Sequence, residues 1–213
     1  MSVDVEGTEK ILLSTGIRVG TPVKTKSMEK FIVKANPEGL YILDIVKTLE
    51  RIEVAASFIS RIDTKRFIVC SAREYGKVPV EKFCELINAT PLIGRFMPGT
   101  FTNSLLPNYM EPLLIMVTDP QFDQQAIVEA SKAGVPVIAI SNSDNIISKI
   151  DLVIPANNRG RKSLATVYWL LTKAVLLKTG RLRAENVSIN SFIYDGKEYR
   201  IDDFETKLEE GEE

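Results

Sequence analysis

The clearest group of residues that could do chemistry is a basic loop in the C-terminal half of the chain. Arg159, Arg161 and Lys162 follow a short apolar run, residues 152–154, and precede an apolar segment that predicts a helix over residues 164–177. The free backbone N–H groups and the dipole at a helix start attract anions, and three cations strengthen that attraction. The loop therefore predicts a phosphate-binding site, although a solvated loop of a basic protein would contain the same residue types.

A second group of cations lies near the N-terminus. It consists of Arg18, Lys24, Lys26, Lys30 and Lys34. Five cations within seventeen residues, interrupted by turn signals, are typical of a surface that binds a polyanion. A charged face that is merely solvated is the alternative interpretation.

A third candidate is the segment RFMPGTFTN, residues 95–103. Its Pro-Gly pair predicts a turn, around which Arg95, Thr100 and Asn103 could offer a charge and neutral hydrogen bonds beside exposed aromatic rings. The segment lacks the lysine and spacing of a Walker loop and is no G-x-G-x-x-G motif. An ordinary turn explains its composition equally well.

Enzymatic chemistry has little support in the composition. The chain contains no histidine, which excludes a histidine-based triad and removes the commonest metal ligand. Asp119 and Asp123 are interpreted as cap and first-turn residues and Asp151 as a strand entry, because no base or nucleophile accompanies them. Cys70 and Cys84 are expected to be buried free thiols in a reducing compartment. We therefore expect no enzyme activity, cofactor or metal.

Charge is divided unevenly along the chain. Residues 185–213 contain ten acidic and three basic residues, a net charge of −7, which leaves residues 1–184 with 24 basic and 18 acidic residues and a net charge of +6. This division predicts a domain of residues 1–184 that binds a polyanion, followed by an acidic C-terminal tail of residues 185–213. The longest apolar runs fall far short of the ~20 residues of a membrane span, and no signal peptide is expected at the N-terminus.

The elements that must position these residues form a βα pattern. Continuous apolar runs at residues 113–117, 135–140 and 152–154 predict parallel strands buried on both faces, and residues 66–71 are also expected to form a buried strand. Apolar spacing predicts helices over residues 45–62, 80–87 and 121–132. In the first, Asp44 is the expected N-cap and Val46 lies on the apolar face. In the last, Asp119 is a possible cap and Phe122 lies on the apolar face. Shorter strands are expected at residues 31–33 and 40–43. The result is an α/β fold, in which ligands bind at the carboxyl ends of the strands.

The acidic tail carries its own structural signal. Asp195-Gly196 separates two strand-like segments, residues 191–194 and 197–201, which predicts a hairpin. Four aromatic residues are too many for a purely solvating tail, so the tail is expected to adhere to a protein surface, either a basic neighbour or the body of this chain. Disorder throughout, mainly of residues 205–213, is the alternative.

Several blocks of sequence resemble one known family. They are ILLSTGIRVGT, KSMEKFIVKANPEGLYILDIVKTLERIEVAASFI, GRFMPGTFTN, VTDPQFDQQAIVEASKAGVPVIAISNSD and IDLVIPANNRGRKSLATVYWLLTKAVLLKTG. Together they resemble the archaeal branch of the small-subunit ribosomal protein S-two family, related to the eukaryotic laminin-receptor-like proteins, over roughly residues 8–180. The resemblance implies a flavodoxin-like three-layer sandwich with a mostly parallel central sheet.

The resemblance also implies a function and partners. The chain would be a structural constituent of the small ribosomal subunit in the cytoplasm, bound to small-subunit rRNA and neighbouring ribosomal proteins, with no membrane or small-molecule partner. Two departures affect it: members often have a histidine where Arg18 stands, and the bacterial coiled-coil insertion has no counterpart between Asp44 and Arg66. The alternatives are a sugar-phosphate or nucleotide-binding enzyme on the same fold and a protein adaptor with a basic face.

Overall fold

A five-stranded parallel sheet lies at the centre of the molecule. The computed structural model describes residue 12, residues 14–188 and residues 190–206. The strands are β3 (Phe67–Ser71), β4 (Thr90–Ile93), β5 (Leu114–Val117), β6 (Val137–Ser141) and β7 (Leu152–Pro155), in the order β4-β3-β5-β6-β7. Every residue of β3, β5 and β6 is buried, which confirms the prediction from continuous apolar runs. The order is the doubly wound, flavodoxin-like one, whose switch point lies between β3 and β5.

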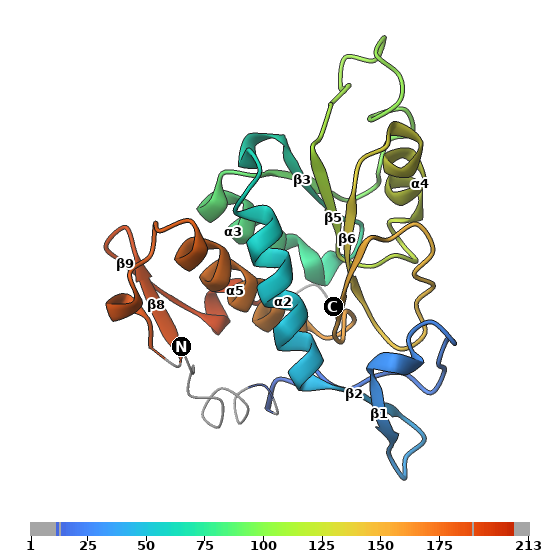
Figure 1. Cartoon of the computed structure of the whole chain (residues 1–213), viewed down its shortest axis with the longest axis vertical. Coiled ribbons are helices and arrows are strands. Elements are labelled where there is room, and N and C mark those ends of the chain that lie inside the picture. Colours follow the sequence, from blue (N-terminus) through green and yellow to red (C-terminus); the bar gives the residue numbers. More distant parts are fainter. Residues whose placement is uncertain (1–11, 13, 189, 207–213) are drawn as a thin grey trace, which may run out of the picture.

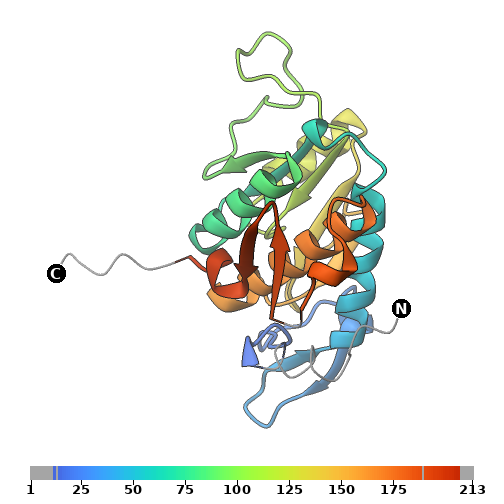
Figure 2. The same cartoon turned by 90° about the vertical axis from the view of Figure 1, so that its left-hand side faces the viewer.

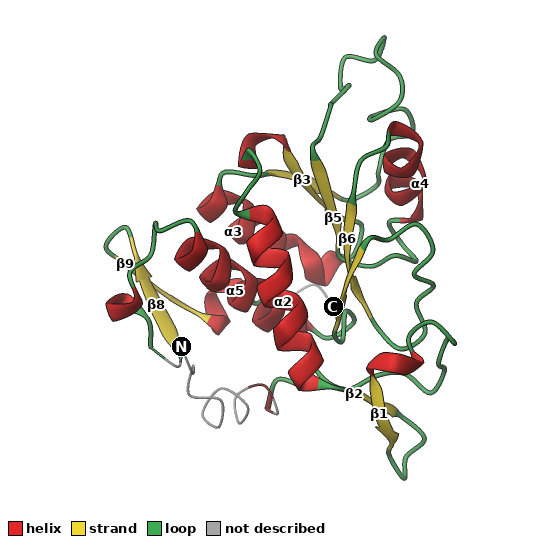
Figure 3. Ribbon diagram, viewed as in Figure 1, coloured by secondary structure: helices red, strands yellow, loops and turns green. Residues whose placement is uncertain are grey.

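Helices cover both faces of this sheet and make it the middle of three layers (Figures 1 and 3). On one face lie α2 (Ile45–Ile59), α3 (Lys77–Ile87) and α5 (Arg161–Lys178), whose apolar side chains share one core cluster with alternate residues of the strands. The other face is covered by α4 (Gln124–Ala133) and by the segment 94–113, which contributes Phe101 to a second cluster. The expected three-layer sandwich is confirmed.

Two small antiparallel sheets extend this sandwich. Near the N-terminus, the 3-10 helix η1 (Glu29–Phe31) leads into β1 (Ile32–Ala35), which pairs with β2 (Tyr41–Leu43). At the other end of the chain, η4 (Ala184–Asn186) precedes the hairpin of β8 (Ser191–Tyr194) and β9 (Lys197–Arg200), followed by η5 (Ile201–Phe204). The remaining short helices are η2 (Thr64–Arg66) and η3 (Glu74–Gly76).

The hairpin predicted in the acidic tail is confirmed, and it packs on this chain's own body (Figure 2). Asp195 and Gly196 both have positive φ, 51° and 74°, as a type I′ turn requires. Phe192 is fully buried in the main core cluster, and Trp169 Nε1 of α5 donates to Tyr199 O at 3.3 Å. Of the two expected surfaces, the described residues therefore use the chain's own helix. Residues 207–213, where disorder was mainly expected, lie outside the described residues.

Several element boundaries differ from the predictions. Strand β4 was not predicted, because Pro91 interrupts its apolar run; an edge strand tolerates a proline. Helix α2 ends at Ile59 rather than at residue 62, and Val46, predicted on its apolar face, is 55% exposed. The cap by Asp44 is confirmed, since its carboxylate accepts from Val46 N at 3.0 Å.

The prediction for α4 was wrong at its start. The helix begins at Gln124, so Phe122 precedes it and is 58% exposed instead of lying on its apolar face. Asp119 does not cap α4; its Oδ1 accepts from Gln121 N at 2.9 Å in the preceding turn. Asp123 occupies the N-cap position, yet its carboxylate makes no capping hydrogen bond and points elsewhere.

Helix α5 begins earlier than predicted. Its first residue is Arg161 rather than residue 164, so Arg161 and Lys162 lie in the first helical turn and not in the preceding loop. Cys70 and Cys84 are buried free thiols, as expected. Among the described residues, no helix combines the length and the apolar character that a membrane crossing requires.

Candidate RNA-binding surface

The N-terminal segment is held against the carboxyl ends of β6 and β7. Ser143, just after β6, accepts from Thr21 N through its hydroxyl and from Thr25 N through its carbonyl, both at 2.9 Å. Asn157, just after β7, donates from its backbone to Ile17 O at 2.8 Å. Gly20 allows this close approach, since a Cβ there would lie 3.0 Å from Ser143 Oγ and 2.6 Å from Tyr41 O. Residues far apart in the sequence thus form one surface.

The loop cations meet this segment from the other side. Asn157 Nδ2 donates to Gly16 O at 3.2 Å, which places the turn before Arg18 beside the loop that contains Arg159. Arg159 is exposed, and its guanidinium forms an ion pair with Asp144, in the loop after β6. Lys162 is exposed in the first turn of α5 and lines a hollow with residues 14 and 15.

The lysines of the N-terminal segment continue the same surface toward the β1–β2 sheet. Lys24, Lys26, Lys30 and Lys34 are all exposed. Lys24 Nζ lies 2.7 Å from Glu29 Oε1, and this hydrogen bond raises the pKa of Lys24. We call the collected cations the basic face: Arg18, Lys24, Lys26, Lys30, Lys34, Arg159, Arg161 and Lys162.

The third candidate segment lies elsewhere. The loop of residues 100–112 is at the end of the molecule opposite the β1–β2 sheet (Figures 1 and 2). The aromatic residues expected to be exposed there are not: Phe101 is 3% exposed and its ring packs on Phe96 at 5.0 Å. Thr100 is buried and its hydroxyl donates to Met97 O at 2.7 Å. The structure therefore does not join this segment to the basic face.

Internal hydrogen bonds also occupy the rest of that turn. Asn103 Oδ1 accepts from Leu105 N at 3.1 Å. Glu129 of α4 accepts from Gly99 N at 2.7 Å and from Phe101 N at 3.2 Å. Although partial burial opposes it, these hydrogen bonds together lower the pKa of Glu129. The ordinary-turn alternative fits Thr100 and Asn103, whereas Arg95 is exposed.

The crevice at the switch point, where such folds bind small ligands, is filled by the chain's own side chains. Asp123, which is buried, accepts from Ala72 N through Oδ1 at 2.9 Å, and burial raises the pKa of Asp123 to about 6. Arg73 Nε donates to the buried carboxylate of Asp119 at 2.6 Å. A Cβ on Gly76 would lie 2.2 Å from Ser71 Oγ, so the backbone itself closes the crevice.

A network of buried amides continues this filling across β6 and β7. Asn145 Oδ1 accepts from Asn142 N at 2.6 Å and from Asn158 Nδ2 at 3.0 Å, while Asn145 Nδ2 donates to Asp119 Oδ1 at 3.2 Å. Sequence reasoning missed these residues. A signal was present in the sequence, because Asn142 directly follows the buried strand β6 and Asn158 lies three residues beyond β7.

This network argues against the enzyme alternative. A sugar phosphate or nucleotide would have to displace paired, buried carboxylates and amides, which costs the desolvation of each. Within the described part of the chain, no group of three or more histidine, cysteine or acidic side chains is placed to hold a metal ion. The arrangement is structural, because it ties the strand ends to the N-terminal segment that carries the cations.

Comparison with known proteins decides the family. Residues 107–177 match the family described as Ribosomal protein S2. The protein of Nitrosopumilus maritimus named small ribosomal subunit protein uS2 is 55% identical over 214 residues, which cover 100% of this chain and 99% of that protein. The chain belongs to the ribosomal protein S2 family. Its resemblance to the archaeal branch, inferred from the sequence blocks, is confirmed.

Other members of the ribosomal protein S2 family show the same likeness. The protein of the same name from Thermofilum pendens is 53% identical over 167 residues, 78% of each chain. The one from Cenarchaeum symbiosum is 47% identical over 204 residues, 96% of this chain and 94% of that protein. The ribosomal protein S2 family is a structural, non-enzymatic one, and this membership decides against the enzyme alternative.

Proposed function

We propose that this chain binds small-subunit rRNA through its basic face. As a member of the ribosomal protein S2 family, it is a structural and not an enzymatic constituent of the small ribosomal subunit, located on the ribosome in the cytoplasm. The observation that carries the proposal is the attachment of residues 16–25 to the strand ends through Ser143 and Asn157. It gathers cations from two distant parts of the sequence at one end of the molecule.

The mechanism is electrostatic. Each lysine or arginine that neutralises a phosphate releases condensed counterions, and this release supplies much of the affinity. Folded rRNA is recognised by its shape, phosphates and 2′-hydroxyls more than by base edges. The ion pair with Asp144 holds the Arg159 guanidinium before RNA arrives, so this arginine can contact a phosphate with the donors that Asp144 leaves unused.

The division of roles along the chain is part of the proposal. Residues 1–184 are the unit that binds rRNA, and residues 185–213 are an acidic tail whose net charge of −7 repels RNA. The described hairpin of the tail packs on α5 in the main core. The boundary near residue 184 therefore separates two regions of opposite net charge and not two separately packed domains. We expect neighbouring small-subunit proteins to contact the surfaces outside the basic face.

Charge reversal tests the basic face. The triple variant Arg159→Glu, Arg161→Glu, Lys162→Glu should bind small-subunit rRNA more weakly, and the slope of log K against log salt should fall by roughly 2–3 if each cation contacts one phosphate. The control is Arg61→Glu, Lys65→Glu, Lys132→Glu, which changes net charge equally at exposed residues near the amino ends of the strands.

The outcome separates specific contacts from net charge. Equal losses in the two triple variants would show that total charge, and not the basic face, governs binding. An unchanged affinity and salt slope in the first variant would show that the basic face is wrongly placed. Sedimentation of cell extract on a sucrose gradient, with the chain detected in small-subunit fractions, checks the ribosomal role independently.

A further inference from the structure

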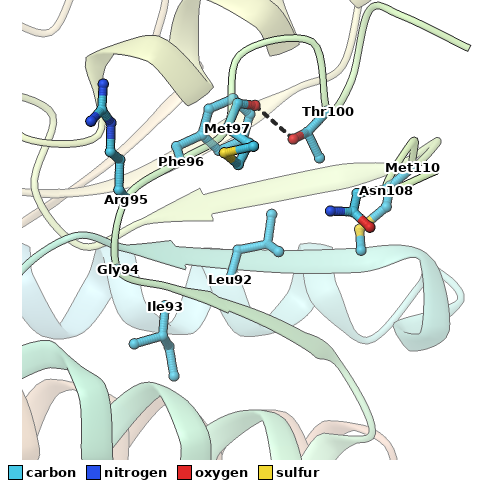
Figure 4. A pocket seen from close by; sticks show the side chains of 9 residues that line it. All are labelled: Leu92, Ile93, Gly94, Arg95, Phe96, Met97, Thr100, Asn108 and Met110. Atoms are coloured by element: carbon cyan, nitrogen blue, oxygen red, sulfur yellow. Dashed lines mark hydrogen bonds between the residues drawn. The ribbon is translucent and has the colours of Figure 1, made fainter. Parts of the chain in front are cut away.

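A pocket of about 270 Å³ lies beneath the segment 94–113, on the sheet face that α4 covers (Figure 4). The side chain of Leu92, in the edge strand β4, points to the sheet face that carries the pocket, while that of Ile93 points to the opposite face. Phe96, Met97, Asn108 and Met110 complete most of the lining, with Arg95 at the rim. The lining is predominantly apolar, with one cation and one amide, which is the composition of a site for an apolar side chain.

The segment that covers the pocket exposes several apolar side chains. Met97 is 62% exposed, Leu105 is 91% exposed and Leu113 is 40% exposed, and all three belong to the one segment. Arg95 is exposed and, among the described residues, makes no hydrogen bond or ion pair. Met97 lines the pocket, and exposed apolar side chains beside a pocket are typical of a protein interface.

The charge of this region separates it from the basic face. Residues 96–131 contain no lysine or arginine, although the chain has 27 such residues. They do contain Glu111, Asp119, Asp123 and Glu129. A surface that meets phosphates needs cations, so a partner of this region is a protein rather than rRNA. Arg95 is the exposed charge beside the pocket, and a carboxylate complements it.

The pocket is held open by contacts within the chain. Glu129 fixes the turn through Gly99 N and Phe101 N. Gly99 has φ of 95°, a conformation that favours glycine at this turn. A surface that needs no ordering before it binds loses less free energy on association.

We propose that this surface, formed by Leu92, Arg95, Phe96, Met97 and Met110 with Leu105 on the same covering segment, docks a segment of another protein that presents an apolar side chain next to a carboxylate. The apolar side chain enters the pocket and the carboxylate pairs with Arg95. Pro91 lacks an N–H on the open edge of β4, so the segment docks through side chains and does not add a strand. The inference rests on the proposed function, since that partner is a neighbouring protein of the small subunit.

Photo-crosslinking in assembled subunits tests the partner. The variant Leu105→benzoylphenylalanine, expressed as the full chain, is isolated in small subunits, irradiated and digested. The expected crosslink is to a protein segment in which an apolar residue adjoins an aspartate or glutamate. The matched control is Ile146→benzoylphenylalanine, because Ile146 is 73% exposed beside the basic face, and it is expected to crosslink to rRNA.

Charge reversal completes the test. Arg95→Glu should lower the chain's occupancy in small subunits about tenfold and leave its affinity for naked rRNA unchanged. Reversal of the partner's crosslinked carboxylate to lysine should restore occupancy. Crosslinking of Leu105 to rRNA, the absence of a crosslink, or full occupancy of Arg95→Glu would each overturn the inference. If the unsubstituted chain is itself absent from small subunits, the proposed function fails instead.

Discussion

The ring of Phe192 lies 5.9 Å from the ring of Trp169, centroid to centroid, and this contact joins the C-terminal hairpin to α5. Phe192 also stacks on Tyr199 at 5.4 Å with an interplanar angle of 19°. A short hairpin is marginally stable alone, so its order depends on this aromatic contact with the body. The hairpin is consequently part of the folding unit even though its charge is opposite to that of the body.

Phe192→Ala should destabilise the whole chain by roughly 3–5 kcal/mol, because it removes a fully buried aromatic side chain. Chemical denaturation followed by circular dichroism measures the change. The matched control is Ile193→Ala on the same strand, which is 47% exposed and should have a small effect. A loss confined to the hairpin, with an unchanged main transition, would show that the tail is an independent unit.

Asp44→Ala should lower the free energy of unfolding by about 0.5–2 kcal/mol, since the carboxylate caps α2. Glu50→Ala, at an exposed position of the same helix, serves as the control. Affinity for small-subunit rRNA should change little in either variant. Normal stability combined with lost RNA binding in Asp44→Ala would instead assign Asp44 a role in recognition.

Asp123 should make stability depend on pH between about 4 and 6. Its pKa is about 6 in the folded state against an ordinary value of 3.8, so the folded state binds the proton more tightly than the unfolded one. The stabilisation is therefore complete below pH 4 and is lost as pH rises toward 6. Denaturation of the native chain and of Asp123→Asn across this range should show the native chain losing stability relative to the variant as pH rises. A difference that stays constant would contradict the raised pKa.

Glu129→Gln should loosen the turn that contains Gly99. A carboxylate offers acceptors to both Gly99 N and Phe101 N, whereas an amide has one oxygen, so one buried N–H loses its partner at a cost of about 1–3 kcal/mol. Hydrogen exchange of these two amides should accelerate. Because the pKa of Glu129 is lowered, the difference between the two proteins should diminish as pH falls below its ordinary value of 4.5.

The control for this change is Glu81→Gln, since Glu81 is exposed on α3. Its exchange rates and stability should match those of the native chain. Unaltered protection of Gly99 and Phe101 in Glu129→Gln would mean that apolar packing of Phe101, and not the carboxylate, fixes the turn.

Local signals were sufficient for much of the fold. Residues 67–71 are all buried, and the first four of them appear in the sequence as an unbroken apolar run. Asp44 and the Asp195-Gly196 turn act through neighbours within a few residues, so their roles could be predicted without knowledge of the tertiary structure. By contrast, β4 owes its position to pairing with β3, and nothing in its own short sequence indicates that partner.

The candidate site depended on long-range contacts that the sequence does not display. Arg18 and Arg159 were both predicted, but their common location follows from hydrogen bonds between residues more than a hundred positions apart. Thr100 is the converse case: its residue type suggests a surface contact, whereas its hydroxyl donates to Met97 O within its own turn. Residue type alone cannot tell an available donor from one already used.

The attachment of residues 16–25 to the strand ends has a consequence for the rate and the energetics of RNA recognition. Cations that are already in position before the RNA arrives give up little conformational entropy when they bind. Residues that never touch RNA can therefore change its affinity. Ser143→Ala would remove the hydrogen bonds that Ser143 makes with the backbone N–H and the hydroxyl of Thr21. The segment of residues 16–25 would then have to be ordered when RNA binds, so the chain should bind rRNA more slowly and more weakly.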